Sequence, residues 1–203
     1  AADPTQIIAV NQAVDARTKE SLEEIAPTTV KPNGYEDWQV PWEKQVETIA
    51  DAVGKKDEGD KLIDDTEKAF EDFRHEHAEL QDKSAAIVMP YDGKIGLYTE
   101  EDGRGQFIED LGMEIPDALQ GDGGSFFVDI APENYAKLNQ VDYLFVLDYN
   151  GSSAALKKDK TFQGLDIVKD GRVRYLDTDT GNAMSMPNPV TIPWAVDKFE
   201  EKL

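Results

Sequence analysis

Arg104 is the residue whose type and surroundings are best suited to binding a ligand. It lies in residues 100–105, which read EEDGRG, so it stands between two glycines just before an expected helix. An arginine flanked by glycines in a polar loop is free to reach the oxygens of a ligand carboxylate, catecholate or hydroxamate with forked donors. An ordinary arginine in a solvated loop is the competing interpretation, and these residues alone leave both open.

Two later loops carry further side chains that could line a binding site. Tyr149 and Asn150 follow the apolar run FVLD, where an aromatic ring and an amide are suited to stacking and hydrogen bonding. The predicted loop 178–189 reads TDTGNAMSMPNP and contains Met184 and Met186. Because these methionines are two residues apart, one can pack inward while the other faces an opening. Simple packing under the loop is the alternative for both.

Together these loops predict a site that binds without catalysis. In an alternating α/β sheet, ligands sit beyond the carboxyl ends of the strands, which is where we expect these loops. Arg104 would supply charge-assisted hydrogen bonds to the ligand. The wall around it would be shaped by Tyr98, Tyr149, Asn150, Asn182 and Met184.

The sequence contains no recognisable motif for catalysis or for metal binding. The histidines are His75 and His77, and residues two apart on a helix point about 200° apart, so the pair cannot share a metal. The sequence has no GxSxG elbow and no cysteine, hence no thiol nucleophile and no thiolate zinc site. The glycine-rich residues 121–124 precede a strand instead of following one, the wrong order for a phosphate loop. We therefore predict no catalytic residue, no metal site and no cofactor.

The charge balance argues against nucleic acid and anionic membranes as partners. The 203 residues include 42 acidic and 21 basic side chains, for a formal net charge of −21, which repels phosphate groups. Any anionic ligand must therefore be met by a few local cations or hydrogen-bond donors. No apolar run approaches the roughly 20 residues that span a bilayer, so we expect no membrane insertion by this chain.

The elements that would position these loops alternate between strands and helices. Apolar residues at helical spacing predict the helices, and short apolar runs between Gly, Asp and Asn predict the strands. The predicted strands are 6–10, 28–30, 85–91, 94–98, 126–130, 142–149 and 172–177, and the predicted helical segments are 11–24, 41–53, 57–80, 104–111, 132–139, 153–166 and 188–202. The second half of the chain is therefore expected to form a three-layer α/β lobe.

Five segments, in the same order, resemble the iron-chelate solute-binding proteins of ABC importers, whose ligands are siderophores, haem and cobalamin. They are DPTQIIA with SLEEIAPTTV, WEKQVETIADAVGKKDEGDKLI, GRGQFIEDLGM, IAPENYAKLNQVDYLFVLD, and FQGLDIVKDGRVRYLD with PNPVTIPWAVDKFEEKL. The resemblance implies two α/β lobes joined by a long helix, with the chelate in the cleft between them. Residues 1–42 would be the C-terminal remnant of the N-lobe, 43–83 the helical connector and 84–203 the C-terminal ligand-binding lobe. We expect the rest of the N-lobe to lie upstream.

The resemblance also implies roles for two residues. Arg104 falls where many siderophore binders place an arginine against the chelate. Glu133 falls where the family has a surface glutamate that pairs with an arginine of the membrane permease, although a glutamate at a helix start also stabilises the helix dipole. Tyr149 stands where binders of catecholate chelates often carry a second arginine, and residues 181–184 lack a tyrosine that some relatives supply to the metal. These departures weaken the case for a catecholate and leave hydroxamate, carboxylate and mixed chelates or haem open.

The sequence thus predicts an extracytoplasmic solute-binding protein that delivers a ferric siderophore to an ABC importer. It would reside in the periplasm or be lipid-anchored at the cell surface, with the permease as its membrane partner. Haem, cobalamin or a bare metal ion on the same scaffold is the first alternative. A surface interaction module, or an enzyme without a recognisable catalytic motif, is the second.

Overall fold

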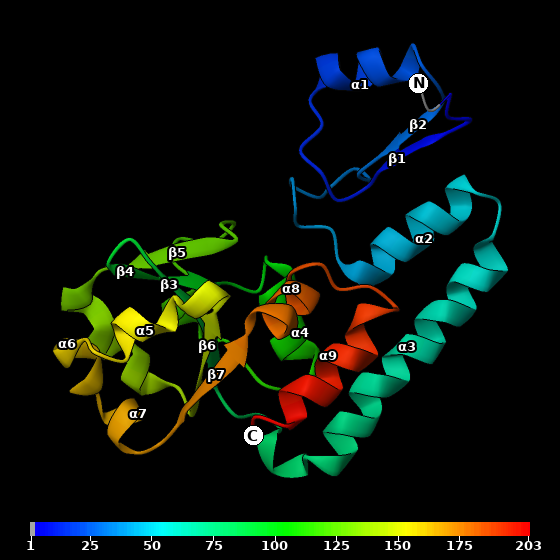
Figure 1. Cartoon of the computed structure of the whole chain (residues 1–203). Helices are drawn as coiled ribbons and strands as arrows, with labels where there is room; N and C mark the ends of the chain where they lie inside the picture. The colour runs from blue at the N-terminus through cyan, green and yellow to red at the C-terminus, as the bar shows by residue number, and fades with distance from the viewer. Residues whose placement is uncertain (1–2) are drawn as a thin grey trace. The chain divides into compact units, whose positions relative to one another are not determined.

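Two compact units make up the chain. The computed structural model describes residues 3–203 and divides into a first unit that ends at Asp65 and a second unit, Thr66–Leu203 (Figure 1). The division falls inside the long helix α3 (Lys56–Glu76), so each half of this helix belongs to a different unit. The three-part division at residues 42/43 and 83/84 stays a prediction.

The first unit is built on a strand, a helix and a strand, followed by two helices. Its elements are β1 (Ile7–Ala9), α1 (Ala16–Glu23), β2 (Thr28–Val30) and α2 (Trp42–Ala52) before α3. β1 and β2 pair in parallel, and the Asp15 carboxylate starts α1 by accepting a hydrogen bond from the Thr18 amide at 2.7 Å. The predicted order of elements is confirmed.

A five-stranded mixed sheet forms the centre of the second unit (Figure 1). Its strands are β3 (Ala85–Tyr91), β4 (Lys94–Tyr98), β5 (Phe127–Ile130), β6 (Tyr143–Asp148) and β7 (Val173–Asp177). They lie in the order β5-β4-β3-β6-β7, with β3, β6 and β7 parallel and β4 antiparallel to both of its neighbours. The five predicted strands of this region are confirmed.

The orientation of β4 follows from the tight turn that precedes it. Asp92 and Gly93 connect β3 to β4 with φ angles of +44° and +74°, the left-handed conformation that a two-residue hairpin turn requires. Tyr98, the last residue of β4, consequently pairs with Ile87 near the start of β3. The loop that leads to Arg104 therefore leaves the sheet at the opposite end from the loops after β6 and β7, which corrects the expectation that all these loops share one edge.

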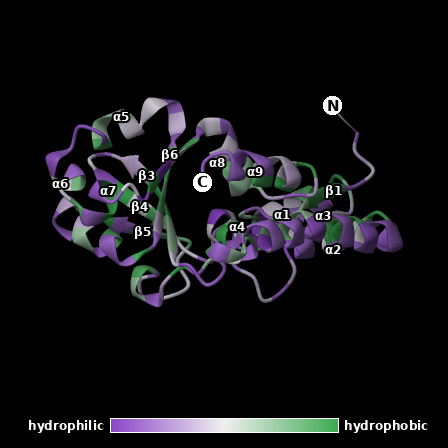
Figure 2. Ribbon diagram, turned by 90° about the horizontal axis from the view of Figure 1, so that it is seen from below, coloured by the Kyte–Doolittle hydropathy of each residue, from purple (hydrophilic) through white to green (hydrophobic). Residues whose placement is uncertain are grey.

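Helices cover both faces of this sheet, as expected for a three-layer α/β lobe (Figure 2). One face lies under the 3-10 helix η3 (Pro132–Gln140) and the short helices α5 (Ser153–Leu156), α6 (Lys160–Gln163) and α7 (Asp166–Lys169). The other lies under α4 (Gly103–Asp110), α8 (Thr178–Ser185) and α9 (Thr191–Glu200). There Phe145 of β6 packs against Phe199 of α9 with ring centroids 4.5 Å apart, and Phe107 of α4 lies 5.5 Å from Phe70 of α3. The predicted α/β class is confirmed.

Two segments differ from the sequence-based prediction. Residues 178–185 form helix α8 instead of a loop, because the Asp177 carboxylate caps it by accepting from the amide and hydroxyl of Thr180 at 2.9 and 2.8 Å. The predicted helical segment 153–166 is broken into three short helices, one of them capped afresh by Asp159. Low intrinsic helix propensity hides such a helix from pattern analysis, and a local cap with tertiary packing supplies its stability.

Candidate functional site

The glycines around Arg104 serve close packing and not flexibility. Arg104 is the second residue of α4, and a Cβ on Gly105 would lie 1.9 Å from the carbonyl oxygen of Thr99. A Cβ on Gly103 would lie 2.8 Å from Cδ of Pro187. The first turn of α4 is thus wedged between the end of β4 and the chain after α8, which fixes the backbone of Arg104.

The guanidinium of Arg104 is held on three sides. Its Nη1 donates to both carboxylate oxygens of Asp102, at 2.9 and 3.1 Å, and its Nη2 lies 3.4 Å from the Tyr149 hydroxyl. Its Cζ lies 4.1 Å from the centroid of the Tyr98 ring, a cation–π contact. Only 15% of the arginine side chain and 13% of the Asp102 side chain are exposed. The interpretation as an ordinary solvated arginine is therefore wrong, and so is the expectation that its glycine neighbours leave it free to move.

We call these four residues, Tyr98, Asp102, Arg104 and Tyr149, the Arg104 cluster. Asp102 is the member that sequence reasoning missed. Its carboxylate also caps α4 by accepting from the Arg104 amide at 2.9 Å. An aspartate two residues before an arginine at a helix start is the signal that could have revealed it, because the cap position brings its carboxylate back over the first turn.

Electrostatics in the cluster keep the arginine charged and the tyrosine neutral. Burial acts to lower the pKa of Arg104, but Asp102, Tyr98 and Tyr149 together outweigh it and raise the pKa. Burial raises the pKa of Tyr98, although the nearby Arg104 opposes this. The Tyr98 hydroxyl therefore stays protonated and donates a hydrogen bond to Sδ of Met89, 3.7 Å away. The Nε of Arg104 is buried without a hydrogen-bond partner within residues 3–203, a cost that the Asp102 and Tyr98 contacts offset.

The segments after β6 and β7 start from the other end of the sheet, but Tyr149 and α8 bring them to the cluster. A Cβ on Gly181 of α8 would lie 2.9 Å from the Tyr149 hydroxyl oxygen, so α8 packs directly on this ring. Asn150 is exposed in a left-handed conformation, with φ of +52°, and its amide donates to the Thr178 hydroxyl at 3.1 Å. Asn182, one residue after Gly181, is exposed as well. The structure thus packs α8 on Tyr149, joins the two segments through the Asn150–Thr178 hydrogen bond and leaves Asn150 and Asn182 at the surface.

The methionines of this region divide between interior and surface. Met184 is completely buried, at 0% exposure, whereas Met186 is 49% exposed. The expectation that one packs inward and one faces outward is confirmed. The choice of Met184 as a wall residue is wrong, because its buried position on the inner side of α8 leaves its side chain no surface to offer a ligand.

Glu133 lies apart from these residues, at the exposed start of η3. It belongs to the first turn of this helix, where a carboxylate also stabilises the helix dipole. The two functions do not exclude each other, since both leave the carboxylate at the surface.

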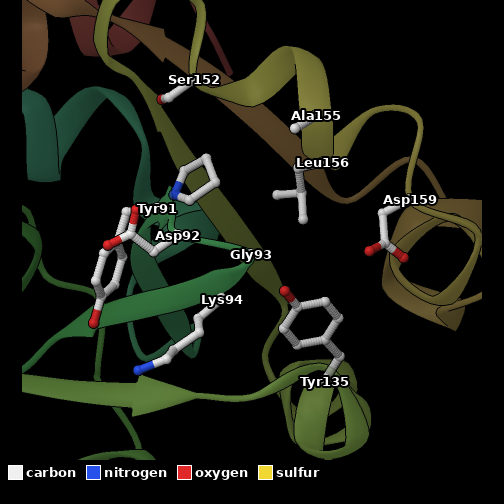
Figure 3. Close-up of a pocket in the computed structure, with 10 residues that line it drawn as sticks. Tyr91, Asp92, Gly93, Lys94, Tyr135, Ser152, Ala155, Leu156 and Asp159 are labelled. Atoms are coloured by element: carbon white, nitrogen blue, oxygen red, sulfur yellow. The ribbon is translucent and has the colours of Figure 1, made fainter.

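Two of the surface pockets formed by the described residues lie beside the sheet of the second unit. One, of about 280 Å³, lies between the β3–β4 turn and α5 and includes none of the predicted ligand-binding residues (Figure 3). Its lining is Pro90, Tyr91, Asp92, Gly93, Lys94, Tyr135, Ser152, Ala155, Leu156 and Asp159. The other, of about 320 Å³, adjoins the loop of the Arg104 cluster and is lined by Glu100, Glu101, Asp117 and Asp122 together with Thr99, Gln120 and residues 121–125. This second pocket is strongly acidic.

Both histidines lie at the end of the long helix, His75 inside α3 and His77 just after it. His77 follows α3; its Nε2 lies 2.9 Å from a carboxylate oxygen of Glu200, and its ring packs on Phe73. Among the described residues, no group of three or more His, Cys, Asp or Glu side chains is arranged to hold a metal ion. Over the same residues, no helix combines the length and apolar character needed to cross a membrane.

Comparison with known proteins gives a family and several similar structures. The model of a family described as "Periplasmic binding protein" matches residues 1–180. The iron uptake ABC transporter substrate-binding protein PiaA from Streptococcus pneumoniae TIGR4 is 26% identical with a TM-score of 0.82, over 98% of this chain and 70% of that one. PiaA in complex with ferrichrome is 25% identical with the same TM-score, over 98% and 68%.

A third structure is similar in fold alone. A periplasmic solute binding protein from Mycobacterium smegmatis str. MC2 155 is 24% identical with a TM-score of 0.84, over 98% of this chain and 68% of that one. Comparison with curated protein sequences gives no match.

Proposed function

Because this chain belongs to the periplasmic binding protein family, we propose that it captures a ferric siderophore outside the cytoplasm and delivers it to an ABC importer. The family resemblance predicted from the sequence is confirmed. The PiaA structure with ferrichrome supports a ferric chelate as the ligand. Members of this family are transport binding proteins, and we propose that this chain likewise binds without catalysis.

The observation that carries the proposal is the buried, charged Arg104 held between Tyr98 and Tyr149. Such an arginine is already oriented and largely desolvated, so its remaining N–H groups can donate to ligand oxygens with little loss of side-chain entropy. Tyr149, Asn150 and Asn182 would contribute the surrounding surface, because Tyr149 contacts the guanidinium, α8 packs on its ring, and both asparagines are exposed. The Tyr98 ring would hold the guanidinium in place through the cation–π contact.

The transporter would be engaged elsewhere on this unit. We propose that Glu133 pairs with a basic residue of the permease, since its carboxylate is exposed at the start of a helix. The protein would work in the periplasm or attached to the outer surface of the membrane through a lipid anchor. The three-part arrangement of N-lobe remnant, connector and ligand-binding lobe belongs to the same proposal.

Titration of the purified protein with ferrichrome, haem and cobalamin tests the proposal, read by quenching of tryptophan fluorescence. We expect saturable quenching by the ferric siderophore. Arg104→Lys keeps the charge and the partner carboxylate but loses the forked donors, so it should weaken binding at least about tenfold. Arg17→Gln, at an exposed position of α1, is the control and should bind like wild type. No quenching by any ferric chelate, or binding of haem or cobalamin alone, would refute the proposal.

A further inference from the structure

We infer that Asp102 makes this site selective for ferric chelates that carry no net negative charge. The inference rests on the proposed function and adds the charge class of the ligand. The one arginine of the Arg104 cluster already has a carboxylate partner inside the protein.

The pairing of Asp102 with Arg104 is built into the fold. Both oxygens of the carboxylate accept from Nη1, and the same carboxylate caps α4 through the Arg104 amide. Both side chains are more than four-fifths buried, where an ion pair is screened much less than at the surface. An anionic ligand would have to compete with Asp102 for the guanidinium, and a displaced Asp102 would be left as a buried charge without its partner.

The surroundings of the pair add negative charge and no second cation. Residues 99–105, 149–152 and 178–187 contain the acidic residues Glu100, Glu101, Asp102 and Asp179, and Arg104 as their one basic residue. Glu100 and Glu101 also line the adjoining acidic pocket with Asp117 and Asp122. The local field therefore opposes an anion even before the guanidinium is reached.

The donors that remain on Arg104 suit a neutral acceptor. Nη1 is engaged with Asp102, while Nη2 makes only a long contact of 3.4 Å with Tyr149. A carbonyl or hydroxamate oxygen can accept from Nη2 while the ion pair stays intact. Three hydroxamates cancel the charge of Fe³⁺, so a ferric trihydroxamate is neutral, whereas a ferric tris-catecholate carries a net charge of −3. The geometry favours the first of these.

Asp102→Asn tests the effect of the negative charge separately from the effect of the helix cap. Asparagine is as good a helix cap as aspartate, so its side-chain oxygen can still accept from the Arg104 amide while the negative charge is removed. Asp102→Ser, a second good cap without charge, guards against an effect peculiar to asparagine. Asp166→Asn removes one charge from an exposed position on α7, on the opposite face of the sheet, and is the matched control (Figure 2).

The dissociation constants of wild type and variants are measured for ferrichrome, as the neutral trihydroxamate, and for a ferric tris-catecholate. Wild type should prefer the neutral chelate. Asp102→Asn and Asp102→Ser should raise the ratio of tris-catecholate affinity to ferrichrome affinity on the order of tenfold above the wild-type ratio, whatever change in affinity the two chelates share. Asp166→Asn should change neither, and circular dichroism and thermal unfolding check that each variant is folded.

The outcomes separate this inference from the proposed function. Wild-type binding of ferrichrome with equal changes for both chelates in the Asp102 variants would overturn the selectivity while leaving siderophore capture intact. So would a wild-type preference for the tris-catecholate. If wild type binds neither chelate, siderophore capture itself fails and the selectivity falls with it.

Discussion

Replacing Gly105 by alanine should destabilise the second unit, even though alanine is the better helix former. The added Cβ would lie 1.9 Å from the carbonyl oxygen of Thr99 and 2.5 Å from its carbonyl carbon. That oxygen already accepts the Asp102 amide at 3.1 Å, and the Thr99 side chain is tied to the Ser125 carbonyl at 2.6 Å. Neither the strand end nor the helix start can therefore yield without breaking a hydrogen bond.

The expected change in the free energy of unfolding is the sum of two losses and one gain. Overpacking against fixed backbone costs up to about 3 kcal/mol, and the lost hydrogen bond costs about 1 kcal/mol. Alanine in place of glycine returns about 1 kcal/mol of helix propensity. We expect a net loss of about 3 kcal/mol in the free energy of unfolding, which lowers Tm by on the order of 10 °C for a unit of this size.

Urea unfolding followed by circular dichroism measures this loss, with Gly164→Ala as the control. Gly164 has an ordinary right-handed φ of −76°, and a Cβ there would meet the Lys160 carbonyl oxygen only at 3.2 Å. The control should lose less than about 1 kcal/mol. A Gly105→Ala variant as stable as wild type would refute the reasoning, because it would mean that the start of α4 is free to move away from β4.

Three further predictions concern other parts of the second unit. The hydrogen bond to Glu200 raises the pKa of His77, so the stabilisation of the fold by this ion pair is fully present below about pH 6.5 and is lost as pH rises through the raised pKa. Unfolding free energies measured over a pH series should show this loss in wild type and not in His77→Gln. Identical pH profiles for the two proteins would contradict the prediction. Met184→Ala should cost about 2–4 kcal/mol in unfolding free energy, while Met186→Ala at its exposed position should cost less than about 0.5 kcal/mol, and equal losses would show that burial is misassigned. Glu133→Ala should leave chelate affinity unchanged and reduce uptake by cells, and uptake equal to wild type would remove its docking role.

The strands were predictable because each is a short apolar run bounded by turn residues. The run YLFVLD of β6, for example, is buried over its four central positions, so burial on both faces leaves a continuous apolar signal. Helix α8 was not predictable in this way. Its residues TDTGNAMS are mostly weak helix formers, and it is stabilised by the Asp177 cap and by the contact of Gly181 with Tyr149.

The candidate site was predictable in part. The position of Arg104 between glycines indicated the loop that leads to the Arg104 cluster, but flanking glycines in a polar loop predict freedom of movement, whereas here they permit close packing. The spacing of Met184 and Met186 predicted that they face opposite ways. Only the packing of α8 showed that Met184 is the buried one. The neighbouring elements determine which of two alternating positions faces the core. A local sequence pattern carries no information about those neighbours.

The sequence by itself determined the class of fold, the order of the elements and the loop that carries the arginine. These depend on composition, periodicity and residue type, which act over a few neighbouring positions. Only the tertiary structure decided that β4 runs antiparallel, that Tyr98 of β4 and Tyr149 just after β6 both meet the guanidinium, and that Asp102 pairs with it. Residues 98 and 149 come together because the sheet folds them onto one face, and the charge that a ligand meets there is a sum over side chains that only the folded chain assembles.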